Sequence, residues 1–258
     1  MKKIKTYLSN LPKVTKWIIG LNFLIYLIFL MTKVFTGVNL QDYFAAYPTY
    51  SENFNPITIF TSMFVHAMFP SHVLTNMVLM LVFAPFVENK IGSKNFLFTY
   101  LFIGFFGYLS VNYSYYVNQY HITNSIQNAG LNIEDIKIDN GVVSEDYLSS
   151  LNENQSNVVS NYNYVISRTY GASAALYGMF ILYLLFNIFN IKKVIFTLIA
   201  LYFIGYTVFV VFNNQPILNG GEFAHFGGIL GGIISFLTYK TKKGISWYPF
   251  FNFIESLR

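Results

Sequence analysis

The chain has 258 residues, of which 54% are hydrophobic and only 10% are charged. About a quarter of the residues in a typical soluble domain are charged, so this composition excludes an ordinary soluble protein and indicates one embedded in a lipid bilayer. The absence of cysteine excludes disulfides, a thiolate nucleophile and a cysteine zinc site. The net charge of +5 comes from short basic clusters beside apolar segments, so we expect no nucleic-acid partner.

Six apolar runs are long enough, or nearly long enough, to cross a hydrocarbon core of about 30 Å. They cover residues 17–35, 73–87, 96–112, 171–191, 194–212 and 223–239. The sequence therefore predicts an all-α membrane protein, a bundle of six transmembrane helices. The first run does not resemble a signal peptide, because Lys33 lies at its far end and no small-residue cleavage site follows it.

The basic residues predict the orientation of these helices, because positive charge is retained in the cytoplasm. One side of the predicted bundle carries Lys2, Lys3, Lys5, Lys13, Lys16, Lys90, Lys94, Lys192, Lys193, Lys240, Lys242, Lys243 and Arg258. The other side carries only Lys33, Lys137 and Arg168. Both termini are therefore predicted to be cytoplasmic. Frequent Asn, Lys, Ile, Phe and Tyr are typical of an AT-rich bacterial genome, so we expect a bacterial plasma membrane.

This topology gives a cytoplasmic N-terminal segment (1–16), a six-helix membrane domain (17–240) and a cytoplasmic tail (241–258). Aromatic residues in the tail favour the inner membrane interface. An external loop of about 55 residues, 113–168, joins the third and fourth helices, and loops this long are usually functional or disordered. We expect a flexible insert here, and a tolerated insertion without a function is the simpler interpretation.

The predicted helices contain few polar residues, and this scarcity excludes several chemistries. The four aspartates all lie in outer loops, which removes the paired intramembrane carboxylates of an aspartyl protease. The sequence lacks an H-E-x-x-H motif, and its helices offer few inward-facing ligands, so we expect no metal and no cofactor. Glu88 closes the second helix beside Lys90, where capping or loop contacts are a better interpretation than ion transport.

Four polar residues remain, and the topology places them at one depth. Ser173, His225, His72 and Asn76 all lie in the first turns of helices that enter from the outer side. An imidazole is the usual base that activates a serine hydroxyl near neutral pH, so Ser173 and His225 form a candidate catalytic pair. His72 and Asn76 are four residues apart on one helix face and can offer two donors to an oxyanion. Because no aspartate lies within the helices, we expect a dyad and not a triad.

Small residues surround this pair. In "AHFGGILGG", Gly228 and Gly232 lie about 60° and about 20° from His225 around the helix, so the face beside the histidine is bare. The fourth helix begins with its own small residues, Gly171, Ala172, Ala174, Ala175 and Gly178. These residues allow the two backbones to approach closely. Tyr177, one turn after Ser173, is then placed to stack on the imidazole.

These motifs resemble those of the rhomboid family of intramembrane serine proteases. "GASA" resembles the family's G-x-S-G, which implies that Ser173 is the nucleophile, and "AHFGGILGG" resembles A-H-x-x-G-x-x-x-G, which implies that His225 is the general base. "HVLTN" resembles the H-x-x-x-N that contributes to oxyanion stabilisation, here His72 and Asn76. The similarity extends from about residue 61 to residue 237, without the insert, and implies a rhomboid-like six-helix bundle.

The sequence departs from the family pattern at three places. Ala174 replaces the second glycine of G-x-S-G, and its methyl group either narrows the oxyanion pocket or is tolerated. Ile57-Thr58 stands where the family has Trp-Arg, which bears on how the first outer loop is anchored. His66 and His72 are separated by five residues where four are commoner, and only His72 keeps the spacing to Asn76.

The sequence thus predicts a serine endopeptidase that cleaves transmembrane protein substrates near the outer membrane face, with helix five as a moving gate. The main alternative is a catalytically inactive relative that binds transmembrane helices. Ala174 in place of the motif glycine favours this alternative, whereas intact Ser173 and His225 argue against it. A small transporter is disfavoured, because no helix holds a charged pair or a broken repeat.

Overall fold

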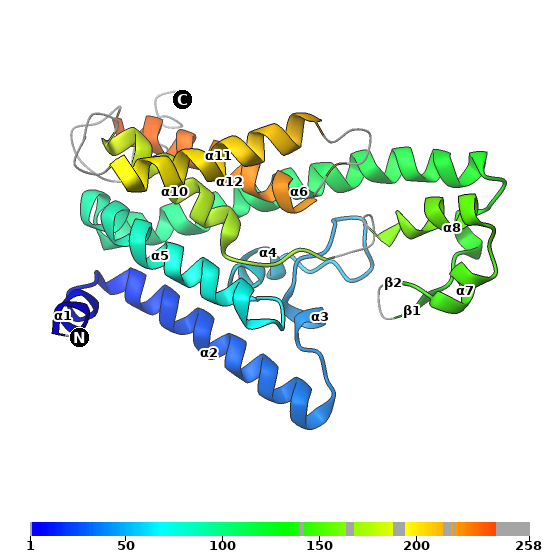
Figure 1. Ribbon diagram of the computed structural model, residues 1–258, viewed down its shortest axis with the longest axis horizontal. Helices are drawn as coiled ribbons and strands as arrows, with labels where there is room; N and C mark the ends of the chain where they lie inside the picture. The colour runs from blue at the N-terminus through cyan, green and yellow to red at the C-terminus, as the bar shows by residue number, and fades with distance from the viewer. Residues whose placement is uncertain are drawn as a thin grey trace, which may run out of the picture.

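Six long helices dominate the computed structural model, which describes residues 2–139, 142–163, 168–187, 194–213, 218 and 220–240 (Figure 1). They are α2 (Lys13–Thr36), α5 (Pro70–Ile91), α6 (Ser93–Asn128), α10 (Ser173–Asn187), α11 (Val194–Asn213) and α12 (Gly220–Lys240). Each one contains or overlaps one of the six apolar runs. Helices α2, α5, α6 and α11 are long and apolar enough to cross a membrane, and α10 is apolar but shorter. The chain is therefore a helical integral membrane protein with four candidate spans among its described residues, and the crossing of the bilayer by α10 and α12 stays a prediction.

Glycine and proline set the ends of the first long helices. Helix α2 ends at Gly37, whose φ of 75° is left-handed and whose N–H caps the Lys33 carbonyl. Helix α5 begins with Pro70, which needs no hydrogen-bond acceptor in the first turn. Gly92, with a φ of 82°, ends α5 and starts α6 without a loop. This glycine makes α5 and α6 neighbours in the bundle.

Glu88 joins α5 to the start of α2. Its side chain is 1% exposed and accepts hydrogen bonds from the backbone N–H groups of Val14 and Thr15, at 3.0 and 2.7 Å. The hydroxyls of Thr15 and Ser93 also donate to it, at 2.7 and 2.6 Å. An anion at a helix N-terminus satisfies free N–H groups and the helix dipole. The predicted capping role of Glu88 is therefore confirmed.

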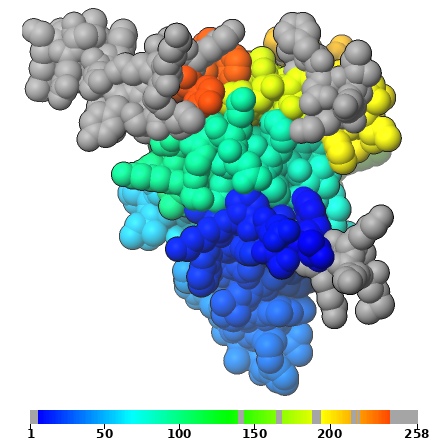
Figure 2. Space-filling view, turned by 90° about the vertical axis from the view of Figure 1, so that its left-hand side faces the viewer, coloured from blue at the N-terminus to red at the C-terminus, as the bar shows by residue number. Residues whose placement is uncertain are grey.

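Helix α10 occupies the centre of the bundle. It packs against α5, α6, α11 and α12, and most of its side chains are buried. The core around it contains Met77, Met80, Phe83, Phe96, Tyr100, Ile103, Leu176, Met179 and Phe180. Helices α2 and α11 lie at the edges and leave many apolar side chains exposed, as expected for surfaces that face lipid. At the end of the molecule that carries α1 (Lys2–Ser9), the N-terminal helices stand to one side of α5 and α6 (Figure 2).

The insert after α6 is folded in its described residues, contrary to the flexible segment expected. Helix α6 continues to Asn128 and projects beyond the bundle (Figure 1). Against this projection lie η2 (Ile133–Asp135), a hairpin of β1 (Ile138–Asp139) and β2 (Val142–Val143), α7 (Glu145–Ser149) and α8 (Glu153–Ser160). A small cluster holds them together: Ile122, Ile126, Ile136, Val143 and Val159. A few apolar residues from α6, the hairpin region and α8 thus form a small core of their own within a mostly polar segment.

The first outer loop contains α3 (Gln41–Phe44), α4 (Thr58–Thr61) and η1 (Ser62–Phe64). Ala46 forms an antiparallel bridge with Thr169, and Arg168 forms an ion pair with Asp42 at 2.6 Å. The Gln41 side chain also donates to the His66 carbonyl. These contacts anchor the loop in a chain that has Ile57-Thr58 in place of the family's Trp-Arg. The tail 241–258, predicted to lie at the inner interface, is outside the described residues.

Candidate active site

Ser173 is the first residue of α10, and the backbone conformation of Gly171, two residues earlier, sets its position. Gly171 has a φ of 124°, a conformation that side chains other than glycine rarely adopt. Its N–H donates to the Ser62 carbonyl at 2.9 Å, which ties the approach to α10 onto η1. Ser173 then begins the helix half-buried, with its backbone N–H among the first groups of α10, where acceptors within the helix are missing.

The bare Cα of Gly171 faces two site residues. A Cβ built at this glycine would stand 3.4 Å from Nε2 of His72 and 3.7 Å from Oγ of Ser173. The imidazole edge and the hydroxyl therefore approach the same small space from α5 and α10. Any side chain at position 171 would fill that space, so the glycine keeps it open.

The hydrogen bonding of His72 decides which of its nitrogens is a donor. The backbone N–H of Ala67 donates to Nδ1 of His72 at 3.1 Å. A neutral imidazole that accepts at Nδ1 carries its proton on Nε2. The donor N–H of His72 is thus the one beside Ser173 and Gly171, where an oxyanion would need it.

Two further residues support His72. Asn76 lies one turn deeper on α5, is 5% exposed, and donates from its amide nitrogen to the His72 carbonyl at 2.9 Å. This bond uses one of the two amide hydrogens and leaves the other available. His66 is 2% exposed, and its ring centroid lies 5.1 Å from that of His72. Burial and the neighbouring His72 lower the pKa of the His66 imidazole to about 4.

His225 lies in the second turn of α12 and is held on two sides. Its ring is stacked on that of Tyr177, with centroids 4.1 Å apart and planes 7° from parallel. Its Nδ1 lies 3.2 Å from a carboxylate oxygen of Glu222, three residues earlier on α12. Among the described residues, no hydrogen bond joins His225 to Ser173. The structure therefore brings Ser173 together with His72, and His225 together with Tyr177, at the same end of the bundle.

The predicted glycines lie where α12 meets α10. A Cβ at Gly228 would overlap the carbonyl oxygen of Ala174, and one at Gly232 would stand 2.7 Å from the carbonyl oxygen of Gly178. Both distances are too short for a real Cβ, so the close approach of the helices depends on these glycines.

The methyl group of Ala174, the departure from G-x-S-G, points at a glycine on another helix. A Cβ at Gly107 of α6 would overlap Cβ of Ala174. Ala174 is 8% exposed, so its methyl group fills the notch that Gly107 leaves open. The structure accommodates the extra methyl group because Gly107 of α6 has no side chain.

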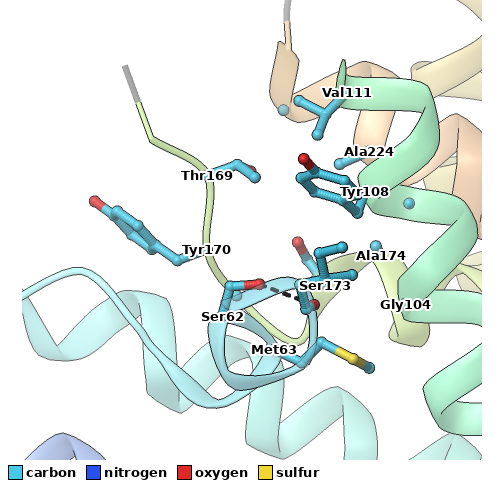
Figure 3. A pocket seen from close by; sticks show the side chains of 14 residues that line it. Ser62, Met63, Gly104, Tyr108, Val111, Thr169, Tyr170, Ser173, Ala174 and Ala224 are labelled. Carbon is cyan, nitrogen blue, oxygen red and sulfur yellow. Dashed lines mark hydrogen bonds between the residues drawn. The ribbon is translucent and has the colours of Figure 1, made fainter. Parts of the chain in front are cut away.

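A small pocket opens beside Ser173 (Figure 3). Its volume is about 60 Å³, which is large enough to admit water. Met63 and Ser62 lie on one side, and Tyr108 and Ala224 lie across from the chain of Thr169 and Tyr170. The described residues contain no group of three or more His, Cys, Asp or Glu side chains that could hold a metal ion.

Sequence reasoning missed Glu222. The expectation of a dyad rests on the absence of aspartate from the predicted helices and does not consider the glutamate three residues before His225. The spacing E-x-x-H in "EFAH" places a carboxylate and an imidazole on one helix face, and this signal was available in the sequence.

The comparison with protein families agrees with this architecture. A family model, the Rhomboid domain, matches residues 53–130 and 142–241. The match includes α5, α10 and α12 with the four predicted catalytic and oxyanion residues, and it extends into the insert. Comparisons with curated proteins and with solved structures gave no match. Because the matched ranges cover more than half of the chain, the family predicted from the motifs is confirmed: the chain belongs to the rhomboid family, which includes serine proteases.

Proposed function

We propose that this protein is an intramembrane serine endopeptidase in which Ser173 is the nucleophile and His225 the general base. The observation that carries the proposal is the arrangement around Gly171, where the Ser173 hydroxyl and the N–H of His72 face one small space at the start of α10. A packing serine needs no imidazole donor fixed beside it. The substrates are transmembrane proteins, cut near the outer membrane face.

The reaction follows from the groups present. Ser173 Oγ attacks the scissile carbonyl while its proton passes to His225 Nε2, and the proton then goes to the leaving amine. The carbonyl oxygen becomes an oxyanion, which accepts hydrogen bonds from the Ser173 backbone N–H, His72 Nε2 and the free hydrogen of the Asn76 amide. Water then attacks the acyl-enzyme, with His225 again taking the proton, and restores the serine.

Ser173 and His225 need to approach one another for the first step, because no hydrogen bond joins them in the described structure. Catalytic hydrogen bonds are often long in the absence of substrate and tighten in the Michaelis complex. At Gly228 the backbone of α12 meets the backbone of Ala174 with no side chain between them, so a small shift of one helix along the other displaces no side chain at this point. The stack on Tyr177 keeps the ring plane constant meanwhile.

Substrate access is proposed to occur between α5 and α11, with all six helices crossing the bilayer and both termini in the cytoplasm. Helix α11 lies at the edge of the bundle, and its aromatic contact with α5 is the edge-on pair of Phe83 and Phe196, with centroids 6.4 Å apart. A substrate helix must also unwind locally, because its backbone carbonyls are hydrogen-bonded inside the helix.

Purified protein in detergent, with a generic transmembrane substrate and a fluorophosphonate probe, tests the activity. Wild type should label and cleave, and Ser173→Ala and His225→Ala should each lose roughly a thousandfold or more of the cleavage rate. Ser125→Ala, on the projecting end of α6, is the matched control. Cleavage retained by Ser173→Ala would refute the mechanism. A folded wild type that neither labels nor cleaves would favour an inactive relative that binds transmembrane helices.

A further inference from the structure

We infer that Glu222 is a positioning residue for His225, so that the proposed Ser–His pair works with a third, carboxylate member. The inference rests on the proposed function for its catalytic consequence, but its structural content concerns one imidazole and stands on geometry alone. Glu222 Oε2 lies 3.2 Å from His225 Nδ1, with both residues on one face of α12. The two side chains are 14% and 18% exposed, so water screens their contact only in part.

A second helix holds the carboxylate in place. Thr207 of α11 is fully buried, and its hydroxyl donates to the same Glu222 oxygen at 2.6 Å. The carboxylate is therefore fixed by donors from α11 and α12. A side chain anchored on both helices has less freedom to swing away from the imidazole than an isolated i,i+3 pair has.

This contact selects the tautomer of His225. An ionised carboxylate only accepts hydrogen bonds, so Nδ1 of His225 is the donor and carries the proton of the neutral ring. Nε2 then keeps its lone pair and is the nitrogen able to take the proton from Ser173 Oγ. With no acceptor at Nδ1, the ring is free to carry its proton on Nε2, and that form is not a base toward the serine.

Glu222 and Tyr177 constrain the ring in different ways. Tyr177 fixes the plane of the imidazole by stacking, and a stack alone allows the ring to turn within that plane or flip. The bond to Glu222 fixes the direction of Nδ1 in the plane. During proton transfer the carboxylate also stabilises the imidazolium, while the proton on Nδ1 stays on the histidine.

The first test follows the tautomer and needs no activity. The chain has four histidines, so ¹⁵N-histidine NMR spectra are simple, and His225→Ala assigns the relevant signals. Wild type should show His225 protonated on Nδ1 near neutral pH. Glu222→Gln should change the Nδ1 and Nε2 shifts of His225 and leave those of His121 in place. Identical His225 shifts in wild type and Glu222→Gln would overturn the inference even if the protein proves inactive.

The second test separates positioning from binding. In an active wild type, Glu222→Gln should lower kcat on the order of 100-fold with KM changed less than about threefold, since only the base is affected. Glu222→Asp should recover part of kcat, and Thr207→Val should give a smaller loss than Glu222→Gln. Glu134→Gln, an exposed glutamate of the insert, is the matched control. An unchanged kcat in Glu222→Gln would overturn the inference, whereas cleavage by Ser173→Ala would refute the proposed function instead.

Discussion

The rings of Tyr177 and His225 lie 7° from parallel with their centroids 4.1 Å apart, although they belong to different helices. This geometry requires α10 and α12 to be close, and small residues at the contact make that possible. The position of the proposed base is therefore set by packing around it as well as by its own hydrogen bond.

Replacement of Tyr177 tests the stack. Tyr177→Phe keeps the aromatic face and should retain most of the activity, whereas Tyr177→Leu removes it and should lower kcat roughly fivefold, in line with about 1 kcal/mol for an aromatic pair. Steady-state cleavage in detergent measures both. Equal activity of the leucine and phenylalanine variants would show that the stack does not position the histidine.

Alanine at Gly228 should destabilise the bundle, because its Cβ would overlap the Ala174 carbonyl oxygen. Overpacking of a fitted interface costs typically about 1–3 kcal/mol, so the thermal unfolding midpoint should fall by several degrees. Gly205→Ala is the matched control, since a Cβ there meets nothing within 4 Å. Similar midpoints for the two variants would contradict the close approach of α10 and α12.

The Ala174 methyl group and Gly107 should behave as a coupled pair. Gly107→Ala alone forces two methyl groups into one space and should lower stability and activity, whereas Ala174→Gly alone leaves a small gap with a modest effect. The double variant exchanges the two residues and should recover most of the loss. A double-mutant cycle with additive effects would mean that the two positions do not touch.

Stability should fall in acid because of His66. Its folded-state pKa is about 4 against an ordinary value of 6.5, so the unfolded chain binds the proton more readily between these values. The contribution of His66 to the free energy of unfolding is complete above pH 6.5 and declines as the pH falls toward 4. It amounts to about 3 kcal/mol at most. Unfolding midpoints of His66→Gln should depend less on pH over this interval, and those of His121→Gln, which replaces an exposed histidine, should follow wild type. If the unfolding midpoints of wild type and His66→Gln fell in parallel as the pH is lowered, His66 would not be the cause of the acid sensitivity.

The number and order of the long helices could be predicted because apolar length and flanking glycine and proline are local properties of the sequence. The ends of the helices were harder to predict from the sequence. Helix α6 continues to Asn128 through polar residues, and only Ile122 and Ile126 indicate its buried face there. The motifs predicted which residues gather at one end of the bundle. They did not predict that Gly107 receives the Ala174 methyl group, because that contact depends on how α6 packs against α10.

The contacts before α10 separate the insert from Ser173. Arg168 pairs with Asp42, Thr169 bridges to Ala46, and the Gly171 N–H binds the Ser62 carbonyl, all within the few residues that precede Ser173. Along the chain, a displacement of the insert meets this clamp before it meets α10. Changes of length or sequence in the insert should therefore leave the position of Ser173 at the start of α10 unchanged.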